Sequence, residues 1–230
     1  MYARIHLKLN GMYPKSWTNN AYGVAYVHEN EKIKMGNSSG WYAGAVINRY
    51  RFKDLGKSKE NQSMFKAGVF KTMSPKNDHN GALQWTVSGD IFAGINNIKR
   101  RYLVVDEVFE AKSDYNSYGA AIKNEISYDI RMSERTHLRP YGALKMEYGR
   151  FNGIKENSGQ LKLEVKGNDY FSIKPEAGIE FKYVQPLAVK TNLSVGVSAA
   201  YENEIGKLQN SNNILTRIIM SFYIFQKHLL

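Results

Sequence analysis

Apolar and polar residues alternate along several long segments of this chain, and this alternation constrains the fold more than any other feature. From Leu83 to Asn96 the odd positions are apolar or small and the even positions are mostly polar, with Phe92 as the exception. A period of two places successive side chains on opposite faces of a β-strand. The pattern recurs over residues 118–131, 137–148, 171–183 and 187–202, and therefore predicts an all-β fold.

The length of these segments narrows the prediction. They run for about 13 to 16 residues, whereas strands of globular proteins usually have about 5–6. Strands that cross a membrane at a tilt need about 9–11 residues, plus overhang. With noisier candidates near the N-terminus, we expect about nine to eleven strands in an antiparallel, up-and-down transmembrane β-barrel.

Alternation alone does not say which face is outside, because a soluble barrel that binds an apolar ligand also has a period of two. The lengths of the connections favour a membrane barrel over a soluble one, because short turns alternate with long loops in outer-membrane barrels. Short turns are predicted at 96–97, 132–135 and 185–186, and long loops at 106–116, 151–169 and after Asn203. The connection 53–62 breaks this rule, because it has ten residues at a place where the alternation predicts a short turn.

Aromatic and charged residues favour the same orientation. Tyr118 and Tyr128 lie on one face, about 25 Å apart along the membrane normal, which is the height of the apolar band between two aromatic girdles. The opposite face carries charges of both signs, as a water-filled lumen would. A solvated sheet would also carry mixed charges.

These arguments assign a face to individual residues. We expect the lipid-facing residues to be Leu83, Trp85, Val87, Ile91, Tyr118, Ile122, Ile126, Tyr128, Leu144, Met146, Tyr148, Ile173, Ile179, Phe181, Tyr183, Leu193, Val195, Val197 and Tyr201. We expect the lumen-facing residues to be Gln84, Asp90, Lys123, Glu125, Asp129, Arg131, Arg139, Lys145, Glu147, Lys174, Glu176, Glu180, Lys182, Lys190 and Glu202.

Composition argues against several other classes of function. The chain has no cysteine, so a disulfide scaffold or a thiolate metal site is excluded. The net charge of +11 is spread along the sequence, with only Lys99-Arg100-Arg101 as a dense run, which disfavours a nucleic-acid interface. No apolar run has the length of a spanning helix. We therefore expect no enzyme activity, no cofactor and no metal, and we assign no catalytic residue.

Five stretches of the chain resemble a known protein family. They are LRPYGALKMEYGRF at 138–151, LEVKGNDY at 163–170, AYENEIGK at 200–207, GWYAG at 40–44 and FKTMSP at 70–75. They resemble the C-terminal translocator domain of large autotransporters, the type V secretion proteins of Gram-negative bacteria. The resemblance covers most of residues 21–207. It implies a twelve-stranded outer-membrane barrel that anchors and helps to export an N-terminal passenger, often an adhesin. The implied partners are outer-membrane lipid, the barrel-assembly machinery and the chain's own passenger.

The family pattern is lost after about Leu208, where an apolar tail follows. We expect a barrel over 1–207, and over 208–230 a divergent tail that is either a frame-shifted piece or a last irregular strand. We also expect the chain to be truncated at both ends relative to the family. The alternatives are a self-contained outer-membrane pore or surface binding barrel, and a soluble β-barrel that binds an apolar ligand.

Overall fold

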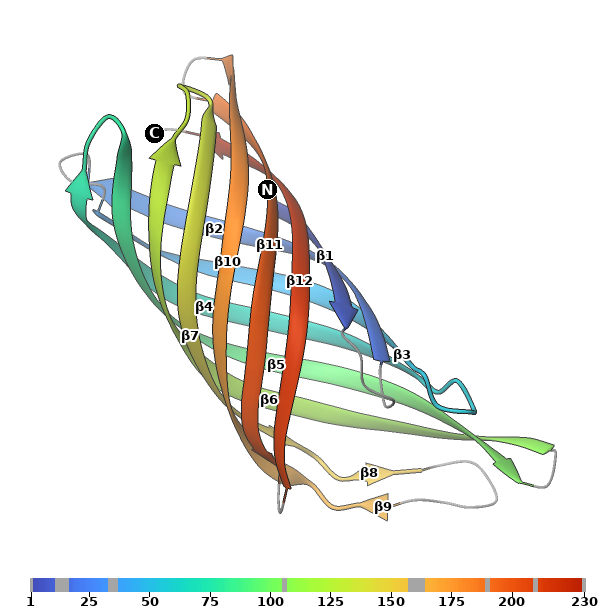
Figure 1. Ribbon diagram of the computed structural model, residues 1–230. Helices are drawn as coiled ribbons and strands as arrows, with labels where there is room; N and C mark the ends of the chain where they lie inside the picture. Colours follow the sequence, from blue (N-terminus) through green and yellow to red (C-terminus); the bar gives the residue numbers. More distant parts are fainter. Residues whose placement is uncertain are drawn as a thin grey trace.

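The computed structural model describes the backbone of residues 2–10, 17–32, 37–104, 107–156, 164–188, 191–208 and 211–228. Side chains are described over 18–30, 37–102, 107–156, 164–187 and 193–205. Ten long strands make up nearly all of this, and a two-residue ladder of β8 and β9 forms a separate arm (Figure 1). The strands are β1 Tyr2–Asn10, β2 Trp17–Lys32, β3 Asn37–Phe52, β4 Lys59–Asn77, β5 Gly81–Val104, β6 Glu107–Arg131, β7 Thr136–Phe151, β8 Ile154–Lys155, β9 Glu164–Val165, β10 Asn168–Ala188, β11 Thr191–Leu208 and β12 Ser211–His228.

The ten long strands form one closed antiparallel barrel. Each strand pairs with its neighbours in the chain, and β1 closes the ring by pairing with both β2 and β12. The β1–β12 pairing runs from Tyr2 opposite Phe225 to Asn10 opposite Arg217. Closure gives each of the ten long strands a partner on both sides within the ring, and the free edges of β5 and β6 are confined to the hairpin that projects beyond it. The predicted fold is confirmed, with a strand number inside the predicted range.

The segment beyond Leu208 supplies the closing strand. β12 pairs with β11 along its whole length, from Leu208 opposite Ser211 to Thr191 opposite His228. The division of the chain into a barrel and a separate tail stays a prediction. What the structure adds is that residues 211–228 extend the sheet in register.

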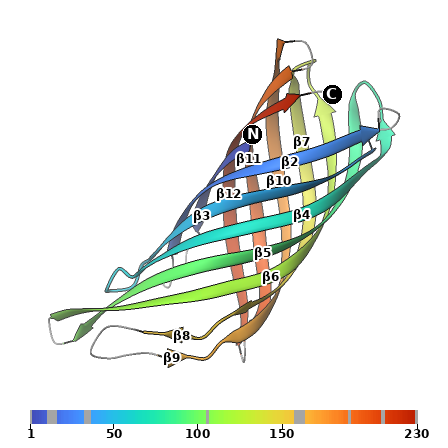
Figure 2. The ribbon, with the colours of Figure 1, turned by 180° about the vertical axis from the view of Figure 1, so that it is seen from behind.

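The two ends of the barrel differ. At one end of the barrel β2, β4, β6 and β10 end and β3, β5, β7 and β11 begin, with only two to four residues between consecutive strands. β1 also begins and β12 also ends there (Figures 1 and 2). At the opposite end, β5 and β6 project beyond their neighbours as a long hairpin, and β8 and β9 form an arm beside it (Figure 1). We call these the short-turn end and the long-loop end.

Four predicted connections were wrong. Residues 185–186 lie inside β10, which continues to Ala188, and β11 continues past Asn203 to Leu208, so that β12 begins only three residues later at Ser211. The other two concern β5 and β6. Residues 96–97 do not turn, because β5 continues to Val104 and pairs with β6 throughout. Residues 107–116, predicted as a loop, are the first part of β6. With that turn removed, the connection after Phe52 falls at the long-loop end. The amides of Asn96 and Asn97 suggested a turn, but Asn96 is fully buried and hydrogen-bonded inside the barrel.

The exception to the alternation, Phe92, also has a structural reason. Its side chain is only 8% exposed and its ring lies over Gly119 of β6. A Cβ at Gly119 would approach Phe92 Cζ to 2.6 Å and the carbonyl oxygen of Tyr148 to 2.3 Å. Tyr170 covers Gly149 in the same way. Glycine therefore makes room for interior rings that a side chain would displace.

Candidate functional site

Most of the residues predicted to face lipid have exposed side chains. Among those predicted to face lipid, the more exposed are Trp85, Ile91, Tyr118, Ile122, Ile126, Leu144, Met146, Tyr148, Ile179, Phe181, Tyr183, Val197 and Tyr201. The others, which are partly covered, are Leu83, Val87, Tyr128, Ile173, Leu193 and Val195. None of them is buried.

The sequence missed the part of this face that belongs to β2, β3 and β4. Exposed apolar side chains there continue the belt: Tyr22, Val24, Tyr26, Trp41, Ile47, Phe65 and Val69. They alternate as expected, but interior positions of the same strands are also apolar or small. The two faces therefore contrast weakly in sequence. Only the register, in which Tyr26 lies opposite Ala43 and Ala43 opposite Ala67, identifies the outer row.

The predicted lumen residues are covered by the barrel wall. Asp90, Glu147 and Glu202 are buried and the others are partly buried; Lys190 lies outside the residues whose side chains are described. Contacts between strands that are not neighbours show that this face is concave. Tyr42 Oη of β3 donates to Asp90 Oδ2 of β5 at 2.9 Å, across β4. Lys123 of β6 reaches Glu176 of β10 across β7, with Nζ 3.9 Å from Oε2.

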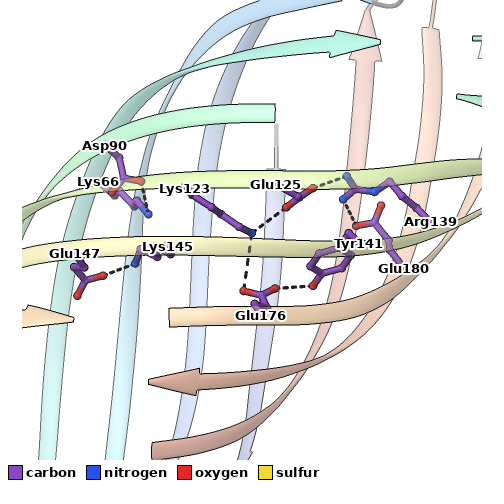
Figure 3. A network of polar contacts seen from close by, with 10 residues as sticks. All are labelled: Lys66, Asp90, Lys123, Glu125, Arg139, Tyr141, Lys145, Glu147, Glu176 and Glu180. Carbon is purple, nitrogen blue, oxygen red and sulfur yellow. Dashed lines mark hydrogen bonds and ion pairs between the residues drawn. The ribbon is translucent and has the colours of Figure 1, made fainter. Parts of the chain in front are cut away.

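An ion-pair network occupies the wall formed by β6, β7 and β10 (Figure 3). Arg139 lies between two carboxylates, 2.9 Å from Glu125 Oε1 and 3.0 Å from Glu180 Oε2. Lys123 Nζ lies 3.0 Å from Glu125 Oε2. Tyr141 Oη donates to Glu176 Oε1 at 2.7 Å. The network thus bridges three strands with charges of both signs.

A second cluster extends this charged wall to β11. Glu147 accepts from Lys145 on its own strand and from Lys174 Nζ of β10 at 3.3 Å. Tyr170 Oη donates to Glu147 Oε1 at 3.1 Å. Lys174 Nζ also lies 3.2 Å from Glu204 Oε1 of β11. Glu147, Lys145 and Lys174 were predicted to face the lumen, whereas Glu204 and Tyr170 were not.

The wall formed by β2 to β5 is organised by amides instead. Asn19 Nδ2 donates to Asn48 at 3.2 Å, Asn48 Nδ2 to Gln62 at 2.9 Å, and Gln62 Nε2 to Asn96 at 2.7 Å. Asn96 Nδ2 then donates to Ser117 Oγ on β6 at 3.1 Å. We call this run the amide ladder. The sequence did not predict it, because its members converge only once the register of five strands is known.

Few charges accompany the amide ladder. The predicted lumen residue Asp90 accepts from Lys66 Nζ at 2.9 Å in addition to Tyr42. The predicted residue Gln84 lies on the same wall and is partly buried. Among the described residues, no group of three or more histidine, aspartate or glutamate side chains could hold a metal ion.

Comparison with known proteins agrees with this architecture. The family model described as the autotransporter β-domain matches residues 10–216. The chain belongs to the autotransporter β-domain family. No curated protein sequence matched the chain in a separate comparison.

Solved autotransporter barrels share the fold of this β-domain. The translocator domain of the autotransporter NalP from Neisseria meningitidis superposes with a TM-score of 0.62 at 10% identity, covering 100% of this chain and 86% of that domain. The β-domain of the Bordetella autotransporter BrkA gives 0.59 at 12% identity, covering 100% and 98%. With its family, this chain is an outer-membrane translocator β-domain, whose family role is passenger export. Among its described residues, no helix is long and apolar enough to cross a membrane.

At its long-loop end, this autotransporter β-domain braces the projecting hairpin. Arg100 Nε and the Nη2 atom donate to the two carboxylate oxygens of Glu156, at 2.7 and 2.8 Å. This bidentate bond raises the pKa of Arg100. Ser113 Oγ donates to the carbonyl of Lys155 at 2.8 Å, and Arg101 N donates to Ser58 Oγ at 3.0 Å. The hairpin is therefore held from both sides by neighbouring connections.

Proposed function

We propose that this β-domain anchors its passenger with the apolar belt against membrane lipid, and that its polar lumen is the passage for one segment of the passenger. The observation that carries this proposal is the closed ring of strands with apolar side chains outside and paired charges inside. In hydrocarbon a strand must satisfy all its backbone groups within the sheet, which only closure allows. The same alternation then matches lipid on one side and water on the other.

The exposed belt supports the assignment of the predicted lipid-facing residues. A contiguous apolar surface around a barrel is far larger than the few hundred Å² that soluble monomers usually expose. Ile91, Ile95 and Val69 are more than 60% exposed, on neighbouring strands. Water would disfavour this surface, whereas an acyl-chain environment stabilises it.

The position of the N-terminal strand supports a route through the lumen. β1 begins at the short-turn end, and long loops of outer-membrane barrels face outward. A passenger that precedes β1 therefore starts on the inner side and reaches the outside through the lumen. The paired side chains of the lumen wall hydrate and guide such a segment, a role in transport rather than catalysis.

Assembly by the cell's barrel-assembly machinery is part of the same proposal. Nine of the ten long-strand pairings join strands that are consecutive along the barrel sequence, but the β1–β12 pairing joins the two ends of the chain. Such a distant pairing is slow to form because loop closure costs entropy before the contacts form. An assembly factor that holds the open edges would shorten this step.

A tag placed before β1 tests the export route. We would fuse a protease-cleavable epitope through a linker of about 40 residues, long enough when extended to traverse the barrel. The expected result is cleavage of the epitope by protease added to intact cells. Epitopes inserted at 55–56 in the long-loop end and at 79–80 in the short-turn end are the accessible and protected controls. Protection of the N-terminal epitope beside a cleaved 55–56 control would contradict export.

Gel mobility tests the closed membrane barrel independently of export. Refolded into detergent, the chain should migrate faster without boiling than after boiling, because a closed barrel resists the gel detergent until heated. A soluble, β-rich protein that needs no detergent and shows no shift would favour the soluble ligand-binding barrel instead.

A further inference from the structure

A row of four cations crosses the outer face at the long-loop end. Arg51 of β3 lies opposite Lys59 of β4, Lys59 opposite Lys99 of β5, and Lys99 opposite Lys112 of β6. With strands about 4.8 Å apart, the row spans about 14 Å. Like charges directly opposite one another destabilise a sheet. An anionic ligand bound to the row would offset this repulsion.

The nearby carboxylates do not neutralise the row. Among the described residues, Arg51, Lys59 and Lys99 form no ion pair. Glu110 pairs with Arg101 at 3.0 Å and more weakly with Lys112 at 3.5 Å. In the part of the chain that the structure describes, the other acids nearby form no ion pair with the row. Asp54, which lines the adjoining loop, accepts from the backbone and hydroxyl of Ser58, Asp114 from Asn97, and Glu60 from Tyr115, whereas Glu156 pairs with Arg100.

A hollow adjoins the row and repeats its charge. It has a volume of about 550 Å³ and is lined by Arg51, Phe52, Lys53, Asp54, Lys57 and Lys59. In the loop that forms it, the Asp54 carboxylate accepts from the backbone N–H and the hydroxyl of Ser58, and Lys57 between them has a φ of 56°. Gly56 packs so tightly that a Cβ there would lie 1.9 Å from the carbonyl oxygen of Arg101. The backbone of this loop is thus packed at Gly56 against β5, the strand that carries Lys99.

The row continues the apolar belt, which indicates its depth in the membrane. Arg51 follows the exposed Ile47 by four residues on β3, and Lys99 follows the exposed Ile95 by four residues on β5. At a tilt of about 40°, four residues cover roughly 10 Å along the membrane normal. Side chains that far beyond Ile47 and Ile95 lie at the level of lipid headgroups.

From these observations we propose that the cationic row and its hollow bind the phosphate groups of anionic lipid headgroups in the outer leaflet. Arginine recognises phosphate through two parallel hydrogen bonds, and lysine contributes a mobile point charge. Membrane lipid is the source, because the row lies on the lipid-facing side and continues the belt. The inference rests on the proposed function, since it requires the belt to lie in a bilayer.

Native mass spectrometry of the detergent-refolded chain tests the site, with lipid A, a bisphosphorylated lipid, as the probe. The triple variant R51Q/K59Q/K99Q should bind lipid A at least ten-fold more weakly than the unaltered chain. The matched control K71Q/K76Q/R135Q removes three exposed cations near the short-turn end and should bind within two-fold of the unaltered chain. Equal binding by the row variant, or an equal loss in the control, would overturn the proposal.

Two further measurements separate the possible failures. Inorganic phosphate at millimolar concentration should leave lipid A bound; full displacement would make this a site for free phosphate and overturn the lipid assignment. All three proteins should keep the heat-dependent gel shift. If the unaltered chain lacks that shift, the membrane barrel fails and the lipid site with it. A retained shift with unchanged lipid binding overturns the lipid site alone.

Discussion

The two walls of the lumen differ in the side-chain interactions that link their strands. The wall of β6, β7, β10 and β11 holds its strands together with ion pairs, such as Arg139 between Glu125 and Glu180. The wall of β2 to β5 uses the amide ladder, in which Gln62 donates to Asn96 at 2.7 Å. Removing one partner from a charged network costs more folding free energy than removing one amide, because it leaves a covered charge unpaired. The charged wall should therefore be the more sensitive to single substitutions.

Loss of one carboxylate from the charged wall should have the largest effect. Glu147→Gln leaves Lys145 and Lys174 facing a neutral amide, and we expect a loss of about 2–3 kcal/mol in the free energy of unfolding. Urea unfolding followed by tryptophan fluorescence measures it. The matched variant of the other wall, Asn48→Ala, removes two amide hydrogen bonds and should cost about 1 kcal/mol. A larger loss in Asn48→Ala would reverse the contrast between the walls.

Crowding an interior ring should have an intermediate effect. Gly149→Ala places a Cβ 2.5 Å from the ring of Tyr170, whose hydroxyl donates to Glu147. Displacing that ring disturbs the charged wall, and we expect a loss of about 1–2 kcal/mol. Gly142→Ala on the same strand is the control, since a Cβ there meets nothing within 4 Å. If both variants unfold at the same urea concentration, the ring does not depend on the glycine.

The smallest effect should come from the turn where the two walls meet at the short-turn end. Asp78 accepts the backbone N–H groups of Asn80 and Gly81, which lowers its pKa, and Arg131 of the charged wall donates to the Asp78 carbonyl. A lowered pKa contributes stability that is present above the usual value near pH 4 and is lost as the pH falls below it. Asp78→Asn should therefore weaken the pH dependence of unfolding below about pH 4. An unchanged pH profile would contradict a role for this carboxylate.

The alternation of apolar and polar residues is also clearer in the strands of the charged wall than in those of the amide wall. On β6, β7 and β10 the outer row is apolar and the inner row carries many charges, so a face could be predicted directly for residues such as Ile122 and Lys123. On β2 to β4 the inner row carries Ala21, Gly44 and Met64, so the contrast between the faces is weak. Inner rings that lie over glycines, such as Phe92 over Gly119, also broke the pattern.

Long-range register could not be read from the sequence. The amide ladder, the partners of Glu147 and the cationic row all join residues whose proximity depends on how several strands align. The end of β5 was misplaced because Asn96-Asn97 has the composition of a turn, whereas pairing with β6 continues the strand to Val104. The closing role of residues 211–228 likewise depends on pairing with β1 at the other end of the chain.

Closure of the barrel between its first and last strands is the central claim, and disulfide trapping tests it most directly. The chain has no cysteine, so a pair can be introduced without background. Ile5 and Phe222 are direct cross-strand partners of β1 and β12, within the Cα separation that a disulfide spans. In outer membranes, I5C/F222C should form an intramolecular disulfide, as should the β11–β12 reference pair V197C/F222C, whereas the out-of-register pair I5C/I218C should not. A disulfide in the reference pair but none in I5C/F222C would show an open sheet and contradict the account.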